Sequence, residues 1–583
     1  MKLQEFYEGQ AFDAYEYFGA HEEKDGVMFR TYAPGASKVT VFGEFNQWTE
    51  EEMIPLEKSG VYELKCEWAK VGMMYKYVIY TKEGWRVEHC DPYGFGMELR
   101  PNSASYIVDL SEYRFHDEVW MKNRDKNYNR PLNIYEVHLG SWRTNEKDEN
   151  GWYRYHEIAD KLIAHAKENG YTHLEFLPLS EHPADCSWGY QNTGYFSPTS
   201  RYGTARDLME LVDKCHQAGI GVIMDFVPIH FATDYYGLAK YDGTELYEYV
   251  QSDVTDSEWG TRNFDYSRRE VCCFLQSAAN YWLKEYHFDG IRMDAISRAI
   301  YWQGEPDRGV NPCALTFMKN MNAGLQKLHP TAMLIAEDST TFLKVTAPVE
   351  YDGLGFDYKW DLGWMNDTLN YFKTPPKERP DYFYNELYLL ALSHDEVVHG
   401  KATIIQKMWG DYEDKFSQCR AFYLYMMTHP GKKLNFMGNE IAQFREWDEK
   451  RQQDWELLKF PMHDGFYHYI RKLNELYCQE EQLYKDEYDR EMFRWLVDDA
   501  TEQSVYAYER GKGEKTLVAV FNFSDEEQEC VIEEAENRIL EECMNSDWHI
   551  YGGSTEKKIE VIRDGEIVLA PFSGRLFWSE KEV

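Results

Sequence analysis

Short apolar runs separated by longer amphipathic stretches organise the middle of this chain. The runs begin at residues 133, 172, 221, 288, 332, 354, 389 and 433. Between them, stretches such as YHEIADKLIAHAKENG (from Tyr155) and ARDLMELVDKCHQAG (from Ala205) place apolar residues at helical spacing. Eight strand candidates that alternate with helices predict a parallel (β/α)8 TIM barrel.

Both ends of the chain show a different pattern, that of short alternating strands. From about Phe29 to Val108, segments such as MFRTYAP and VYELKCEW lie between turn residues, and we expect Trp48 and Trp68 to belong to the core of this module. After about Glu480 strands return in SVYAYER and TLVAVFNFS. The predicted fold class is therefore α/β, with an N-terminal β-sandwich module (1–120), the barrel (121–480) and a C-terminal β-sandwich domain (481–583).

Polar side chains accumulate where four of the predicted barrel strands end. Any one of them could be a helix cap or a surface charge, but four strands that end alike favour a functional site. Active-site residues of such barrels lie at the C-terminal ends of the strands, so we expect these side chains to converge on one mouth. The strand ends are DFVPIHF (Asp225, His230), DGIRMDAI (Arg292, Asp294), AEDST (Glu337) and SHDE (His394, Asp395).

The spacing of these residues indicates a reaction that uses two carboxyl groups. Arg292 and Asp294 are two positions apart on a strand and face the same side, where the guanidinium should favour the ionised carboxylate. Glu337 on the next strand should face Asp294 across a bound sugar at about 5–5.5 Å, the separation of retaining glycosidases. Apolar surroundings and the nearby negative charge should raise the pKa of Glu337, so that it can protonate a leaving oxygen.

The remaining polar residues suit sugar binding better than metal binding. A neutral His394 and an ionised Asp395 can bond sugar hydroxyls, and we expect Asp225 to order the pocket wall. His394 and His399 could suggest metal ligands, but no third ligand lies at suitable spacing. We therefore expect neither a catalytic metal nor a cofactor.

The composition favours a neutral ligand over nucleic acid. The 583 residues carry a net charge of −38, which repels a phosphate backbone, and 16% of them are aromatic, so some can stack on sugar rings. The first residues, MKLQEFYEGQ, hold no apolar signal core, no stretch reads as a membrane-spanning helix, and the 11 cysteines are scattered. We expect a cytoplasmic protein, a monomer or weak oligomer, with no membrane partner.

The four strand-end segments resemble the conserved segments of the α-amylase superfamily of glycoside hydrolases. The resemblance implies that Asp294 is the nucleophile, Glu337 the acid/base and Asp395 the stabiliser of the transition state. It also places four further residues in the substrate site: Asp225, His230, Arg292 and His394.

A narrower resemblance is to the bacterial 1,4-α-glucan (glycogen) branching enzymes. It is carried by SWGYQNTGYFSPTSRYG (from Ser187), LSHDEVVHGK (from Leu392) and GFDYKWDLGWMNDTL (from Gly355). The resemblance implies cleavage of α-1,4 bonds in glycogen, amylose or amylopectin and transfer to a C6 hydroxyl through a covalent glycosyl intermediate, with Tyr190 stacked on the sugar. The family's loop after the nucleophile is replaced here by the shorter YWQGEPDRGVNPCALTF (from Tyr301), so an α-amylase-type or debranching hydrolase remains the alternative.

Overall fold

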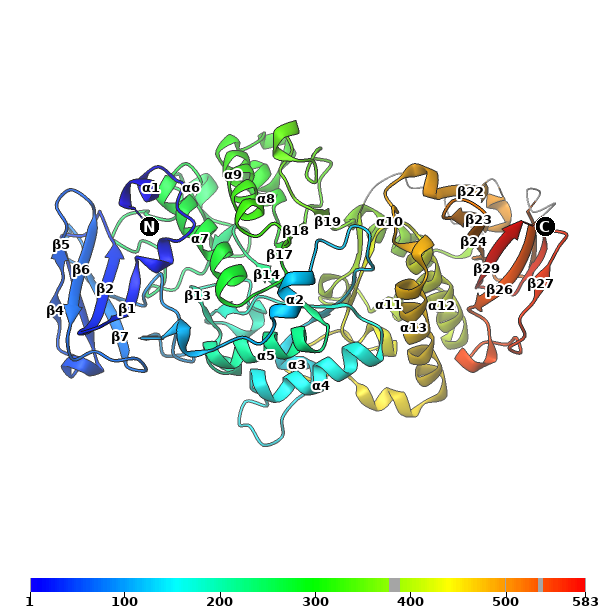
Figure 1. The fold of residues 1–583 in the computed structure, drawn as a ribbon, viewed down its shortest axis with the longest axis horizontal. Helices are drawn as coiled ribbons and strands as arrows, with labels where there is room; N and C mark the ends of the chain where they lie inside the picture. Colours follow the sequence, from blue (N-terminus) through cyan, green and yellow to red (C-terminus); the bar gives the residue numbers. More distant parts are fainter. Residues whose placement is uncertain (1, 377–387, 499, 533–537, 582–583) are drawn as a thin grey trace.

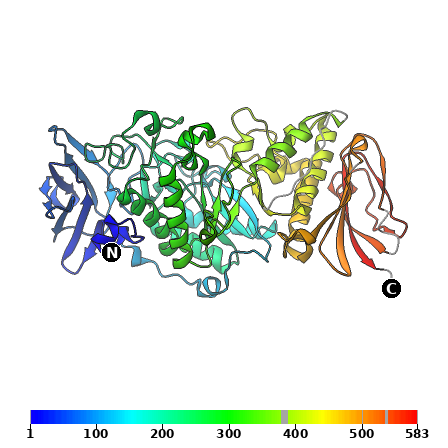
Figure 2. The same cartoon turned by 90° about the horizontal axis from the view of Figure 1, so that it is seen from above.

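The chain forms an elongated molecule with a barrel in the middle and β-sheets at both ends (Figure 1; Figure 2 shows it from above). This is a computed structural model, and it describes residues 2–376, 388–498, 500–532 and 538–581. The order of the parts along the molecule follows their order along the sequence, so the two ends of the chain lie on opposite sides of the barrel (Figure 1). None of the described helices is long and apolar enough to cross a membrane.

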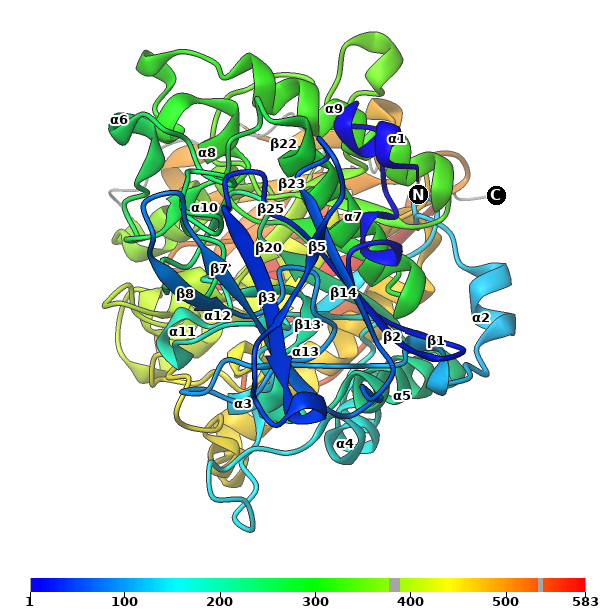
Figure 3. The same ribbon diagram turned by 90° about the vertical axis from the view of Figure 1, so that its left-hand side faces the viewer.

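Two antiparallel sheets make up the N-terminal β region, which faces the viewer in Figure 3. One sheet has the order β1-β2-β6-β5; the other has the order β4-β3-β7-β8, with β9 paired to β7. In β2, Val27, Phe29 and Thr31 are buried and alternate with partly exposed residues, as a strand with one face on a core requires. The strands are β1 (Gly19–Glu23), β2 (Gly26–Tyr32), β3 (Lys38–Gly43), β4 (Glu51–Glu52), β5 (Ile54–Pro55), β6 (Val61–Cys66), β7 (Met74–Tyr80), β8 (Arg86–His89) and β9 (Ser105–Tyr106).

Two tryptophans of this region lie outside its core, so the prediction for them was wrong. Trp48 is 41% exposed and Trp68 is 73% exposed. Trp48 lies in a turn with φ 59°, where its ring and the Phe42 ring are T-shaped with centroids 5.4 Å apart, and Trp68 follows the end of β6. Strand alternation assigns a face only to residues inside a strand, and neither tryptophan is inside one.

Eight parallel strands form the barrel, and each of the eight predicted runs supplies one of them. Their order is β19-β18-β17-β14-β11-β10-β21-β20. A parallel bridge between Trp360 and Leu389 brings the two ends of this sheet together, so the barrel is nearly closed. The strands are β10 (Asn133–Val137), β11 (His173–Phe176), β14 (Gly221–Phe226), β17 (Gly290–Met293), β18 (Met333–Ala336), β19 (Tyr358–Lys359), β20 (Leu389–Leu392) and β21 (Lys432–Phe436).

Amphipathic helices alternate with these strands. The two stretches with helical spacing form α4 and α5, which confirms their prediction. The helix α5 begins with a capping box, in which the Thr204 side chain accepts from the N–H of Asp207. The longer helices are α4 (Tyr155–Glu168), α5 (Ala205–Gln217), α7 (Arg269–Glu285), α9 (Pro312–Leu328), α10 (Leu362–Lys373), α12 (Tyr412–Thr428) and α13 (Pro461–Gln479).

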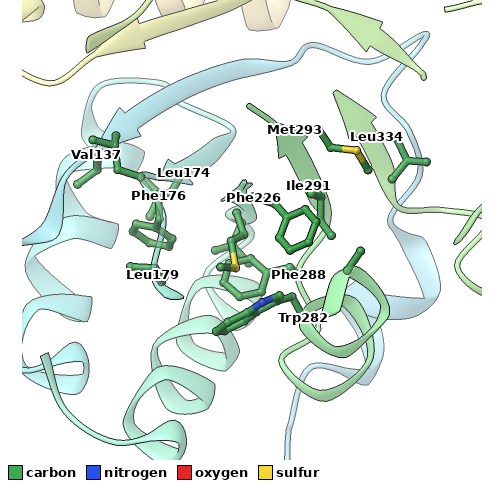
Figure 4. Close-up of a cluster of buried hydrophobic side chains, with 14 of the residues drawn as sticks. Val137, Leu174, Phe176, Leu179, Phe226, Trp282, Phe288, Ile291, Met293 and Leu334 are labelled. Carbon is green, nitrogen blue, oxygen red and sulfur yellow. The ribbon is translucent and has the colours of Figure 1, made fainter. Parts of the chain in front are cut away.

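The outward faces of the barrel strands supply the apolar layer beneath these helices. Figure 4 shows Phe226, Ile291 and Met293 from β14 and β17 in one buried cluster with Trp282 of α7. Each of these side chains is at most 1% exposed. Full burial of one large apolar side chain stabilises the fold by about 1.5–3 kcal/mol, so this layer sets the position of each strand.

The inward faces change from apolar to polar along the strands. On these inward faces, Ile134, Ile223 and Ile335 belong to one buried apolar cluster inside the barrel. Side chains two positions apart on a strand share a face, so the next inward residues lie above this apolar plug. Those residues are Glu136, Asp225 and Glu337.

The C-terminal region is a second pair of sheets. A six-stranded sheet has the order β22-β23-β24-β29-β26-β27, and β25 pairs with β28. Val505, Val520 and Phe577 belong to the buried core of this region. The strands are β22 (Phe493–Val497), β23 (Val505–Arg510), β24 (Lys515–Asn522), β25 (Gln528–Val531), β26 (Arg538–Asn545), β27 (Val561–Ile562), β28 (Glu566–Leu569) and β29 (Ser573–Lys581).

A buried ion network ties the segment before the barrel to the barrel. The imidazole of His216 on α5 lies 2.8 Å from Asp117 through Nδ1 and 2.9 Å from Asp289 through Nε2. The Trp120 ring stacks on it at 5.3 Å. Burial lowers the pKa of His216, but the charges of Asp289 and Asp117 outweigh burial and raise that pKa to about 9.

This network predicts a pH-dependent part of the stability. The folded pKa of His216 exceeds the unfolded value of about 6.5, so its contribution is complete below about pH 6.5 and is lost as the pH rises through about 9. We expect the substitution His216→Gln to lower the free energy of unfolding most near about pH 6 and least near about pH 10. Urea unfolding of both proteins across this range measures the effect; a difference that does not change with pH would contradict it.

Candidate active site

Arg292 lies at the centre of the polar residues in the barrel mouth. It is fully buried, and its guanidinium contacts three carboxylates. Nη1 lies 2.5 Å from Oδ2 of Asp225 and 3.0 Å from Oδ1 of Asp294, while Nη2 lies 2.6 Å from Oε2 of Glu337. The structure thus brings together residues from β14 and from the ends of β17 and β18. The Trp360 ring, 4.1 Å from the guanidinium carbon, supports the cation from another side.

A strained turn directly after Asp294 places a backbone N–H beside the carboxylate of Glu337. Ala295 follows Asp294 with φ 45°, in the left-handed region that a residue with a Cβ seldom adopts. Its N–H donates to Oε2 of Glu337 at 2.9 Å, so this carboxylate receives a backbone donor as well as the guanidinium. The side chains of Asp294 and Glu337 are 13% and 15% exposed, so both reach the mouth.

The electrostatics of Asp294 differ from the expectation drawn from its spacing to Arg292. Burial raises the pKa of Asp294 well above its usual range; Arg292 opposes this effect, and repulsion from Glu337 and Asp225 adds to it. Arg292 does favour the ionised form, as expected from the spacing, but its guanidinium is shared among three carboxylates and burial outweighs it.

His394 and Asp395 lie in the same mouth, after β20. Nδ1 of His394 is 2.6 Å from Oε1 of Glu136, and Nε2 is 3.5 Å from Oδ1 of Asp395. Burial lowers the pKa of His394, but Glu136 and then Asp395 outweigh burial and raise that pKa to about 9. The expected neutral imidazole was therefore wrong: His394 is a cation at neutral pH. Burial opposes ionisation of Asp395, but its pKa is lowered because the charges of His394 and Arg292 prevail.

The contact between Glu136 and His394 predicts that replacing Glu136 changes how activity depends on pH. The substitution Glu136→Gln removes the largest influence that raises the pKa of His394, so we expect that pKa to fall toward the ordinary value of about 6.5. Above about pH 6.5, His394 would then lose the proton with which it can donate to a sugar hydroxyl, so activity should drop relative to the unchanged protein. Activity near about pH 5.5 should be retained. Parallel pH–activity profiles test this, and superimposable alkaline limbs would refute it.

Tyr190 and His230 line the walls of the mouth. The Tyr190 hydroxyl donates to Asp225, and its ring stacks on that of His394 with centroids 5.5 Å apart. His230 begins the short strand β15 (His230–Phe231), which pairs with β16 (Arg262–Asn263). Burial lowers the pKa of His230 to about 4, so its imidazole is neutral. Among the described residues, nothing hydrogen-bonds its buried Nδ1.

Three parts of the chain match known families. Residues 17–94 match Carbohydrate-binding module 48 (Isoamylase N-terminal domain). Residues 145–259 match the Alpha amylase, catalytic domain, and residues 495–575 match the Alpha amylase, C-terminal all-beta domain. These matches follow the three-part order of the fold.

Relatives that match nearly the whole chain identify its family more specifically. The 1,4-alpha-glucan branching enzyme GlgB of Bacillus caldolyticus is 43% identical over 94% of this chain and 85% of its own length. The protein of the same name from Bacillus cereus is 40% identical over 98% of this chain and 94% of its own length. The chain belongs to the 1,4-alpha-glucan branching enzyme family. The resemblance drawn from the motifs is thereby confirmed.

Solved structures share the fold of this branching-enzyme chain. A putative alpha amylase from Salmonella typhimurium superposes with a TM-score of 0.73 at 17% identity, over 97% of this chain and 100% of its own. A pullulanase from Anoxybacillus sp., complexed with maltotetraose, gives a TM-score of 0.75 at 17% identity, over 98% of this chain and 89% of its own. At this identity the likeness establishes the fold alone.

Sequence reasoning missed two buried acids of this branching-enzyme barrel. Glu136 on β10 and Glu175 on β11 are neighbours in register and are fully buried. Neither carboxyl oxygen of Glu175 has a hydrogen-bond partner among the described residues, and burial followed by the charges of Glu136 and Asp225 raises its pKa well above the usual range. The signal was present, since each is an inward polar residue near a strand end. Within the described ranges, no three His, Cys, Asp or Glu residues form a metal site.

Proposed function

We propose that the protein is a 1,4-α-glucan branching enzyme that works by retaining double displacement. It cleaves an α-1,4 bond of a linear glucan and transfers the chain to a C6 hydroxyl, forming an α-1,6 branch. The observation that carries the proposal is the guanidinium of Arg292, which holds the carboxylates of Asp294 and Glu337 together in one solvent-accessible mouth. The names of the whole-chain relatives support the same reaction.

In the first half of the proposed cycle, Asp294 attacks the anomeric carbon as Glu337 protonates the leaving oxygen. The C1–O4 bond breaks and a bond from C1 to the Asp294 carboxylate forms. This step needs one charged and one protonated carboxyl group, and the guanidinium of Arg292 contacts both of them. In the second half, Glu337 takes the proton of an acceptor C6 hydroxyl, the C1–O6 bond forms and Asp294 leaves.

The surrounding residues bind the sugar that changes charge in this cycle. Asp395, held ionised by the neighbouring His394, stabilises the positive charge that develops at C1. The cationic His394 donates to a sugar hydroxyl, and the neutral His230 offers another polar contact. Tyr190 stacks on the sugar at the cleavage point, and Asp225 holds Arg292 and Tyr190 in place.

Incubation with amylose tests this function. Isoamylase treatment releases any new branches for sizing, and reducing ends are assayed before that treatment. We expect α-1,6 branches to appear while reducing ends barely rise. If reducing ends rise and no branches form, the protein is an α-amylase-type or debranching hydrolase on the same fold.

The proposal also covers the substrates, the cellular location and the oligomeric state of the enzyme. Its partners are α-1,4-glucans such as glycogen, and we place it in the cytoplasm, in glycogen biosynthesis, as a monomer or weak oligomer. The N-terminal module (1–120) and the C-terminal domain (481–583) flank the catalytic part and contribute none of the catalytic residues. No metal or cofactor takes part in the proposed cycle.

A further inference from the structure

A hairpin between β14 and β17 carries an exposed tryptophan to the mouth. Trp259 lies in the turn of this hairpin, which is closed by a bridge between Asp256 and Arg262. Its ring centroid is 5.0 Å from that of His230, yet 43% of the residue is exposed. An exposed indole beside a buried substrate-site histidine presents a flat apolar surface to the ligand.

Residues after the nucleophile hold this tryptophan in place. The guanidinium carbon of Arg298 lies 5.2 Å from the Trp259 ring centroid. Nη1 of Arg298 donates to the carbonyl of Gln303 at 2.6 Å, and Nη2 pairs with Glu258, the neighbour of Trp259. Arg298 is thus fixed from two sides while it packs on the indole.

The shortened loop after Asp294 braces the same hairpin. A bridge between Tyr301 and Val310 closes this loop. The side chain of Gln303 donates to the carbonyls of Asp253 at 3.1 Å and Asp256 at 2.8 Å, so it links this loop to the helix α6 (Ser252–Thr255) and to the start of the hairpin. The loop that departs from the family pattern therefore contacts the segment that presents Trp259.

The connection to Glu337 indicates which part of the substrate meets Trp259. Ile296, two residues before Arg298, donates its N–H to the Glu337 carbonyl at 3.0 Å. The hairpin belongs to the β14–β17 connection, whereas Tyr190 stacks on His394, which follows β20. Because an acid/base carboxyl contacts the leaving oxygen and later the acceptor oxygen, a platform tied to Glu337 lies on the acceptor side.

We propose that Trp259 is the platform on which a glucose ring of the acceptor glucan stacks, and that Arg298 and Gln303 are the positioning residues that hold it. This inference rests on the proposed function and adds a determinant of transfer against hydrolysis. A stacked acceptor ring places its C6 hydroxyl near Glu337 and excludes competing water from the glycosyl intermediate.

The test compares branches formed with reducing ends released on amylose. We expect Trp259→Ala to lower this ratio about five- to tenfold, while hydrolysis stays within about twofold of the unchanged enzyme. Trp259→Phe should restore most of the ratio. Arg298→Ala should lower it in the same direction, and the double variant should be no worse than Trp259→Ala alone, because Arg298 acts through Trp259.

The controls separate failure of this inference from failure of the proposed function. Tyr351→Ala, at a residue that is 74% exposed and whose backbone bonds Pro348 and Lys344 rather than a residue of the mouth, should leave the ratio unchanged. An unchanged enzyme that forms no branches would refute the proposed function itself. If the unchanged enzyme branches but Trp259→Ala keeps its ratio, or loses branching and hydrolysis in parallel, the acceptor platform is refuted.

Discussion

Replacing Asp294 by Ala should abolish branching and hydrolysis together, with a loss of about 10⁴-fold or more. Both outcomes pass through the covalent intermediate, which needs the carboxylate of Asp294, so neither water nor a glucan acceptor can rescue the reaction. Assays of reducing ends and of isoamylase-released chains on amylose measure both routes at once.

The isosteric variant Asp294→Asn is the matched control for folding. Burial and neighbouring carboxylates raise the pKa of Asp294, which means that its charged form destabilises the fold at neutral pH. We therefore expect Asp294→Asn to unfold at no lower temperature than the unchanged protein while it remains inactive. Turnover by Asp294→Ala within about tenfold of normal would overturn the nucleophile assignment.

Substitution of Arg292 should have the second largest effect. Arg292→Lys keeps the charge, but a single ammonium cannot contact Asp225, Asp294 and Glu337 in the geometry of the guanidinium. We expect activity to fall by about 10²–10³-fold, because the two reacting carboxyl groups lose their common anchor. Steady-state rates of branching on amylose measure this loss.

Arg292→Met extends this prediction to stability. It leaves buried carboxylates without a partner, so the free energy of unfolding should fall by about 3–5 kcal/mol. Because protonation removes those charges, the loss should be larger at about pH 8 than at about pH 5. Urea unfolding at the two pH values measures it, and an equal loss at both would contradict the role of Arg292 as counter-ion.

The strand pattern predicted more of the site than the individual charges did. All eight barrel strands were found from their apolar runs, because a buried parallel strand has a local signature. The same rule of alternation places Asp225, Arg292 and Glu337 inside the mouth. Charge states were harder to predict: pairing Arg292 with Asp294 by spacing left out the other carboxylates that share the cation.

The sequence by itself determined the three-part fold, the strand ends that supply the mouth and the family motifs, because each depends on residues close together in the chain. Only the tertiary structure decided how distant segments meet. Glu136 makes His394 a cation across 258 positions, and the loop that holds Gln303 braces the hairpin of Trp259. Such contacts depend on how the elements pack in three dimensions, and no local pattern records that packing.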